Sequence, residues 1–158
     1  MKTSIEGRRA LITGAGSGIG RAVAQRLSEL GCDVVLVGRT GATLNETATL
    51  CPGVTKTVTC DLTDENSILA LVGYIRATGG LDILVNNAGV VQAGPLEGIS
   101  TEEFDAVMAT NVRAPFILMR ETLPLLKASP APEIVNICSV VAHEGYPNQS
   151  AYVASKHA

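Results

Sequence analysis

Residues 13–20 read Thr13-Gly14-Ala15-Gly16-Ser17-Gly18-Ile19-Gly20, a glycine-rich turn between two apolar segments. Residues 8–13 have the short apolar pattern of a strand, and residues 19–30 carry apolar side chains at helical spacing. Glycines allow a tight strand-to-helix turn, in which backbone N–H groups at the helix N-terminus can approach a pyrophosphate. The stretch therefore predicts an α/β fold that can bind such a group; read alone, it also fits a plain tight connection.

The same alternation of strand and helix continues along the chain. The expected strands are residues 8–13, 33–37, 54–59, 81–85 and 133–138. The expected helices are residues 19–30 and 64–78, pieces of residues 100–127 bent or restarted at Pro115 and Pro124, and a final helix from about residue 152. This order predicts a Rossmann-like, doubly wound parallel sheet with helices on both faces. In such sheets ligands lie beyond the carboxyl ends of the strands.

Composition narrows the class of protein. Of 158 residues, 46% are hydrophobic and 17% are charged, which favours a packed globule, and the net charge is −3. No basic run indicates a nucleic-acid partner, and no apolar run is long enough to span a membrane, so a cytoplasmic protein is expected. The four cysteines, at positions 32, 51, 60 and 138, are too widely spaced for a metal motif and are expected to be buried.

The end of the second expected strand indicates which dinucleotide is preferred. NAD-binding folds of this kind place an acidic residue there, which binds the ribose 2′-hydroxyl. This chain has Gly38-Arg39-Thr40 instead, with no carboxylate. Because a guanidinium suits a 2′-phosphate, Arg39 favours NADP(H) over NAD(H). The alternative interpretation is a solvated loop arginine.

Tyr152 and Lys156 are four residues apart near a helix start, so their side chains project from one face. An ammonium group beside a tyrosine favours the phenolate form and makes proton exchange easier at neutral pH. The pair therefore has a physical reason to exist, although a surface pair at this spacing is also common.

Taken together, these motifs resemble the short-chain dehydrogenase/reductase family, including members like 3-oxoacyl-carrier-protein reductases and carbonyl reductases. The form T-G-x-x-x-G-I-G matches residues 13–20, N-N-A-G matches residues 86–89, and Y-x-x-x-K matches Tyr152 and Lys156. The resemblance covers about residues 7–158. It implies hydride transfer between nicotinamide C4 and a carbonyl or secondary alcohol of a small molecule.

The resemblance also assigns expected roles residue by residue. The implied catalytic residues are Asn111, Ser139, Tyr152 and Lys156, with Tyr152 as general acid/base. The implied cofactor-binding residues are Gly14, Ser17, Gly18, Ile19, Gly20, Arg39, Asp61, Leu62, Asn87, Ala88, Gly89, Tyr152 and Lys156. No metal ligand is implied.

The resemblance further implies a homodimer or homotetramer that associates through the helices between Ser100 and Lys127. Residues 1–158 are expected to be a single NAD(P)-binding domain, incomplete at its C-terminal side because the chain stops two residues after Lys156. The alternative function is therefore a truncated, catalytically incompetent dinucleotide-binding or oligomerisation module. An extended-family epimerase or dehydratase fits less well, because its glycine spacing differs.

Overall fold

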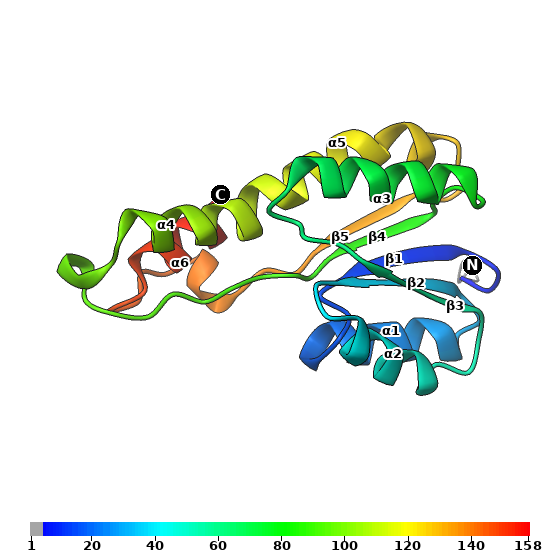
Figure 1. Cartoon of the computed structure of the whole chain (residues 1–158), viewed down its shortest axis with the longest axis horizontal. Helices are drawn as coiled ribbons and strands as arrows, with labels where there is room; N and C mark the ends of the chain where they lie inside the picture. The colour runs from blue at the N-terminus through cyan, green and yellow to red at the C-terminus, as the bar shows by residue number, and fades with distance from the viewer. Residues whose placement is uncertain (1–4) are drawn as a thin grey trace.

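The chain folds around a parallel sheet in the order β3-β2-β1-β4-β5 (Figure 1). The structure is a computed structural model and describes residues 5–158. The strands are β1 (Arg9–Thr13), β2 (Asp33–Gly38), β3 (Thr55–Thr59), β4 (Ile83–Asn86) and β5 (Glu133–Asn136). Beyond β3 the chain returns to the other side of β1, so the strand order reverses between β1 and β4. This is the switch point at which open α/β sheets bind their ligands.

Helices cover both faces of the sheet. Helices α1 (Gly18–Glu29) and α2 (Gly41–Thr49) lie on one face, and α3 (Glu65–Ala77) and α5 (Ala114–Lys127) lie on the other (Figure 1). Because side chains alternate along a strand, β1 sends Ala10 and Ile12 into the α1/α2 core and Leu11 into the α3/α5 core. The prediction of a doubly wound α/β sheet is confirmed.

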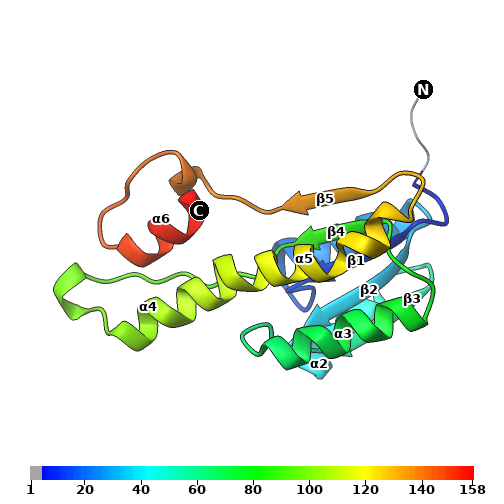
Figure 2. The same cartoon turned by 90° about the horizontal axis from the view of Figure 1, so that it is seen from above.

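A smaller group of helices extends beyond the carboxyl ends of the strands (Figure 2). Helix α4 (Thr101–Met108) continues through a π-helical turn, η2 (Ala109–Arg113), directly into α5. Helix α6 (Ser150–His157) packs against α4 and η2, beside the short 3₁₀ turns η1 (Leu96–Gly98) and η3 (Val140–Ala142). We call α4, η2 and α6 the distal helices.

The ends of several helices are fixed by the residues expected there. The Ser100 side chain accepts a hydrogen bond from the backbone N–H of Glu103, whose carboxylate accepts one from the Ser100 N–H, which forms a capping box. Asp64 caps α3 by accepting from the N–H of Asn66. Gly31, at a φ of +85°, follows α1 in the left-handed conformation that glycine adopts easily.

The structure corrects four details of the sequence interpretation. Helix α2 was not anticipated, because only Leu44 and Thr47 of it are buried and the apolar pattern is weak. Strand β5 ends at Asn136, two residues early, and α6 begins at Ser150, two residues early. Strand β4 begins at Ile83, two residues later than expected. Cys138 therefore lies outside β5 and is exposed, whereas the other three cysteines are buried.

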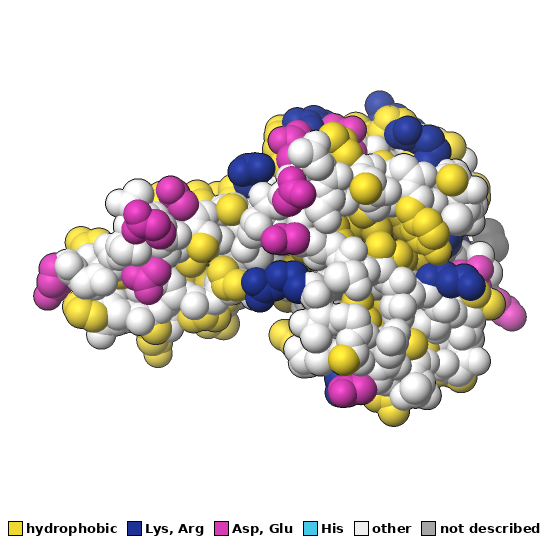
Figure 3. Space-filling view, viewed as in Figure 1, with side chains coloured by type: hydrophobic (Ala, Val, Ile, Leu, Met, Phe, Trp, Pro, Cys, Tyr) yellow, Lys and Arg dark blue, Asp and Glu magenta, His cyan; other side chains and the backbone are white. Residues whose placement is uncertain are grey.

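Charged side chains are spread unevenly over the surface. Figure 3 shows acidic side chains at the α4 end and in the middle of this face, and basic side chains in separate small groups. No helix within residues 5–158 has the length and apolar character needed to cross a bilayer. Strand β5 forms one edge of the sheet, and all four of its residues are exposed.

Candidate functional site

A cavity of about 420 Å³ lies at the carboxyl ends of β1 to β4. Most of the predicted cofactor-binding residues line it: Gly14, Ser17, Gly18, Ile19, Arg39, Asp61, Leu62, Asn87, Ala88 and Gly89. They come from four loops that are far apart in the sequence, and the sheet brings them together at its switch point. Gly20 is buried behind the glycine turn, and Tyr152 and Lys156 lie on α6.

The glycine turn is packed so closely that side chains are excluded from parts of it. Gly14 has a φ of +65°, and a Cβ there would lie 2.9 Å from Asn87 Nδ2. A Cβ on Gly20 would lie 2.3 Å from the carbonyl oxygen of Gly14. The turn thus brings bare backbone and the N-terminus of α1 to the edge of the cavity, the arrangement that binds phosphate groups in other α/β folds.

Thr13 joins the glycine turn to the loop after β4. Its side-chain oxygen accepts hydrogen bonds from the backbone N–H groups of Asn87 and Ala88, both at 3.0 Å. The Asn87 side chain in turn donates to the carbonyl oxygens of Thr13 and Gly14. Thr13 is buried, so these bonds fix one wall of the cavity. Sequence reasoning placed Thr13 in the motif but gave it no role; the T that opens the motif was the available signal.

Arg39 and Asp61 lie on the opposite side of the cavity, after β2 and β3. Hydrogen bonds from the backbone N–H of Thr63 (2.9 Å) and from its hydroxyl (2.7 Å) lower the pKa of Asp61 below its usual value. The positive charge of Arg39 lowers that pKa further. This wall therefore presents an exposed guanidinium and an ionised carboxylate.

The second group of predicted residues lies where the distal helices meet the sheet. Lys156 Nζ donates to the carbonyl oxygen of Ile137 at 3.0 Å and lies 5.9 Å from the centre of the Tyr152 ring. Lysine and tyrosine thus share one side of α6, as their spacing predicts. A Cβ on Gly89 would lie 3.3 Å from Asn111 Oδ1 and 3.8 Å from Lys156 Nζ. Gly89 therefore joins this group to the end of the cavity.

Asn111 is held by the backbone of the loop after β4. Its Oδ1 accepts from the Val90 N–H at 2.8 Å, and its Nδ2 donates to the Val90 carbonyl and to Ser155 Oγ, both at 2.9 Å. The residue lies in the π-helical turn η2, and π-helical turns are frequent at functional sites. Nothing in the local apolar pattern indicated this turn.

Ser139 lies just after β5 and begins η3, where its side chain accepts from the Val141 N–H at 3.4 Å. Within residues 5–158, no direct hydrogen bond joins the Ser139 and Tyr152 side chains. His143, in the following loop, is exposed. The structure thus brings Asn111, Tyr152 and Lys156 into one group and places Ser139 on the neighbouring loop.

Several residues that sequence reasoning did not select also line the cavity, among them Thr40 and Thr43 of the α2 region. A Cβ on Gly16 would lie 2.4 Å from Thr43 Oγ1, so the glycine turn and α2 are in direct contact. These residues were missed because α2 itself was missed. The threonine-rich composition of residues 40–49 was the only local signal.

The parallel sheet, its switch point and the glycine turn after β1 define a Rossmann-like α/β protein. The model of the short chain dehydrogenase family matches residues 8–158, nearly the whole chain. The chain belongs to this family.

Individual relatives agree with this assignment. Gluconate 5-dehydrogenase of Gluconobacter oxydans is 37% identical over 159 aligned residues, which cover 98% of this chain and 62% of that protein. L-xylulose reductase of Bos taurus is 38% identical, over 100% of this chain and 64% of that protein. A solved metagenomic short-chain oxidoreductase in complex with NADP superposes with a TM-score of 0.91 at 37% identity, over 98% of this chain and 72% of that one. The chain thus spans less than two thirds of the length of these two curated relatives.

Proposed function

We propose that this chain supplies the cofactor-binding and reactive residues of an NADP(H)-dependent oxidoreductase that interconverts a carbonyl and a secondary alcohol. The observation that carries the proposal is the cavity at the switch point, which Gly89 joins to Asn111 and Lys156. Residues 1–158 would act as a single dinucleotide-binding unit. Dehydrogenase and reductase names among the relatives, and a similar structure that holds NADP, support this class of reaction.

The residues of the cavity fit a dinucleotide. A Cβ on Gly14 or Gly20 would crowd the turn, so the bare backbone there leaves room for a pyrophosphate near the N-terminus of α1. Within residues 5–158, the backbone N–H groups of Gly16 and Ser17 make no hydrogen bond with the chain. These donors would bind phosphate oxygens. The Asp61 carboxylate, after β3, would accept a hydrogen bond from the adenine edge.

Arg39 supports NADP(H) as the preferred form. It follows Gly38, the last residue of β2, and lines the cavity, and no carboxylate occupies the end of this strand. A guanidinium there would form charge-assisted hydrogen bonds with the 2′-phosphate, which NAD(H) lacks. Arg39 is thus the positively charged side chain of this wall, and Asp61 the negatively charged one. A ligand whose 2′-phosphate lies next to Arg39 is therefore favoured over one that has a hydroxyl there.

The reactive residues are proposed to act as follows. The bound nicotinamide supplies or accepts a hydride at C4. Tyr152 would give its phenolic proton to the carbonyl oxygen on reduction, or take the hydroxyl proton on oxidation. Ser139 would donate a hydrogen bond to the same oxygen as negative charge develops on it. Lys156 would bind the ribose and favour the phenolate of Tyr152, and Asn111 would hold the end of a water-linked proton path.

The proposed substrate is a small carbonyl compound or secondary alcohol, and the proposed assembly is a homodimer or homotetramer in the cytoplasm. Helices α4 and α5 expose the apolar side chains of Phe104 (42%), Phe116 (57%) and Leu123 (42%), which supports association through this part of the chain. On the face in Figure 3 the Lys and Arg side chains lie in separate small groups and form no continuous basic patch. This supports a small-molecule partner over nucleic acid.

Calorimetric titration of the chain with NADPH and NADH tests the cofactor assignment. We expect NADPH to bind more tightly, and Arg39→Ala to weaken NADPH binding by about tenfold while changing NADH binding little. Equal losses for the two dinucleotides would refute the role of Arg39. A chain that binds neither dinucleotide would refute the proposed function.

Turnover with a panel of ketones and alcohols tests the reaction. Tyr152→Phe should abolish most turnover while leaving NADPH affinity intact, because the ring stays and only the proton donor is lost. Turnover retained by Tyr152→Phe would remove Tyr152 from the acid/base role. Binding without any turnover would instead favour the alternative, a dinucleotide-binding module, which the partial coverage of the relatives supports.

A further inference from the structure

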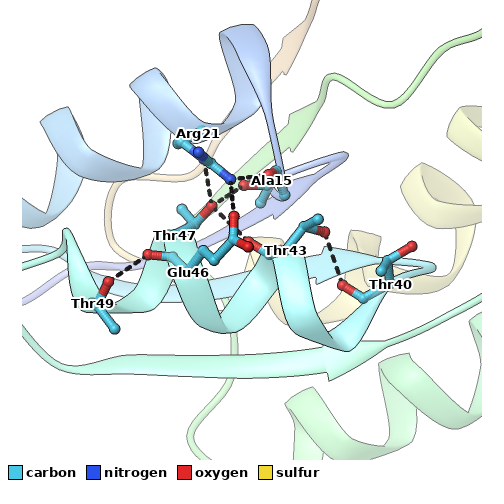
Figure 4. Close-up of polar contacts among 8 residues, drawn as sticks. Ala15, Arg21, Thr40, Thr43, Glu46, Thr47 and Thr49 are labelled. Carbon is cyan, nitrogen blue, oxygen red and sulfur yellow. Dashed lines mark hydrogen bonds and ion pairs between the residues drawn. The ribbon is translucent and has the colours of Figure 1, made fainter.

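A hydrogen-bonded group of three side chains joins the glycine turn to α2, outside the residues assigned above (Figure 4). Arg21 on α1 donates through Nη2 to the Gly16 carbonyl at 2.6 Å and to Glu46 Oε2 at 3.1 Å. Its Nε donates to Thr47 Oγ1 at 3.0 Å. Glu46 and Thr47 both belong to α2. We call Arg21, Glu46 and Thr47 the α2 clamp.

Thr47 is the buried centre of the α2 clamp. Its side chain has no solvent exposure, and its hydroxyl lies 2.9 Å from the Ala15 carbonyl and 3.1 Å from the Thr43 carbonyl. A hydroxyl has one proton, so only one of these carbonyls receives it at a time, while Arg21 occupies a lone pair. The bond to Ala15 crosses from α2 to the glycine turn. The bond to Thr43 stays within the helix.

These bonds determine which way two peptide groups of the turn face. In a trans peptide the C=O and the following N–H point in opposite directions. Because the Ala15 and Gly16 carbonyls point to Thr47 and Arg21, the N–H groups of Gly16 and Ser17 point away from the clamp. Both residues line the cavity. The clamp thus turns two free donors away from α2.

The clamp also fixes the separation between the turn and the Arg39 loop. Thr43 Oγ1 donates to the carbonyl of Thr40, the residue after Arg39, so α2 carries this loop with it. A phosphate that contacts only the turn depends on the clamp through the orientation of the Gly16 and Ser17 N–H groups alone. A 2′-phosphate held between the turn and Arg39 contacts both, and its binding therefore depends on their separation.

We infer that the α2 clamp is a positioning device for 2′-phosphate recognition: Arg21, Glu46 and Thr47 hold the turn and the Arg39 loop at the spacing that selects NADPH over NADH. This inference rests on the proposed function. It predicts that loosening the clamp weakens NADPH more than NADH and so reduces selectivity, measured as the ratio of their Kd values.

The test is calorimetric titration of NADPH, NADH and 2′,5′-ADP with the unsubstituted chain and with clamp variants. Thr47→Val keeps the shape of the buried side chain and removes the hydroxyl, while Thr47→Ser keeps the hydroxyl as the matched control. We expect Thr47→Val to weaken NADPH and 2′,5′-ADP about fivefold and NADH less than twofold, a loss equivalent to about one of the two hydrogen bonds that the hydroxyl makes at a time. Thr47→Ser should retain the selectivity of the unsubstituted chain.

Two variants, one of the partly exposed Arg21 and one of the exposed Glu46, give the same readout without changing the buried Thr47. Arg21→Met and Glu46→Gln alter side chains that are 30% and 65% exposed, so circular dichroism should show an unchanged fold. We expect Arg21→Met to reduce selectivity as much as Thr47→Val, and Glu46→Gln to reduce it about twofold.

The outcomes separate the inference from the proposed function. If Arg21→Met and Thr47→Val leave the ratio of the NADPH and NADH Kd values unchanged, whether or not both affinities fall, the clamp has no role in selectivity and the inference is overturned. If the unsubstituted chain binds neither dinucleotide, the proposed function fails first. If Thr47→Val does not fold, Arg21→Met and Glu46→Gln decide the question by the same ratio.

Discussion

Gly20→Ala tests whether close packing behind the glycine turn holds the site together. Helix α1 places Gly20 so that a Cβ would lie 2.3 Å from the Gly14 carbonyl oxygen and 2.5 Å from Asn87 Nδ2. Both distances are far inside van der Waals contact, and the first obstacle is backbone, so no rotamer change relieves it. The turn itself must move away from the loop after β4.

The expected cost follows from three effects. Overpacking of a tight site costs about 1–3 kcal/mol. Displacing the Asn87 side chain from the Gly14 carbonyl, which it contacts at 3.3 Å, removes a hydrogen bond worth about 1 kcal/mol. Alanine regains about 1 kcal/mol relative to glycine in a helix. We therefore expect a net loss of about 2 kcal/mol, which lowers the Tm of a chain of this size by about 4–8 °C.

Gly73→Ala is the matched control. Gly73 lies within α3, is exposed, and a Cβ there meets no atom within 4 Å. The same chemical change should therefore stabilise the chain by roughly 0.5–1 kcal/mol and raise the Tm by about 2 °C. Thermal unfolding followed by circular dichroism gives both values, and NADPH titration should show weakened binding for Gly20→Ala only. A Gly20→Ala chain with unchanged Tm and unchanged NADPH affinity would refute the packing argument.

Three further predictions follow from the site. Thr13→Val should destabilise the chain by about 1–3 kcal/mol in urea unfolding, because two partly buried N–H groups lose their buried acceptor; a loss below about 0.5 kcal/mol would contradict this. The pKa of Asp61 is lowered in the folded chain by its hydrogen bonds from Thr63. The stability that these bonds contribute should therefore be fully present above the usual aspartate pKa and should be lost as pH falls through the lower native pKa. In an NMR titration, Thr63→Val should raise that pKa, and an unchanged midpoint would show that the hydroxyl is not responsible. Ellman's reagent should react quickly with Cys138 alone in the native chain and lose this phase in Cys138→Ser, since the other three thiols are buried and burial raises their pKa.

The sheet and the glycine turn could be predicted because their causes are local. Strands such as β2 are buried on both faces and therefore appear as continuous apolar runs. The turn requires glycine where φ is positive, as at Gly14, and where another loop approaches, as at Gly20, and both requirements are visible in the sequence. Caps such as Ser100 are visible for the same reason, because the bonding partner lies three residues away.

The contacts that complete the site were not predictable, because their partners are distant in sequence. Thr13 bonds residues 74 and 75 positions away, and Arg21 bonds Thr47, which is 26 positions away. Helix α2 buries little apolar surface of its own and is held to the glycine turn partly by the polar α2 clamp, so periodicity does not indicate it. The two-residue errors lie at the end of β5 and at the start of α6. Both boundaries adjoin a loop, where the sequence pattern defines an element's last residue least well.

The position of Tyr152 and Lys156 depends on bonds that α6 makes to other elements. These bonds set the register of α6: Lys156 donates to the Ile137 carbonyl after β5, and Asn111 donates to Ser155 on α6 and to the Val90 carbonyl after β4. One asparagine in the π-helical turn thus connects the loop beside the cavity to the helix that carries the tyrosine. The loop that contains Val90 follows β4, and the loop that contains Ile137 follows the adjacent strand β5. The register between β4 and β5 therefore also sets the distance between the cofactor cavity and the reactive side chains on α6.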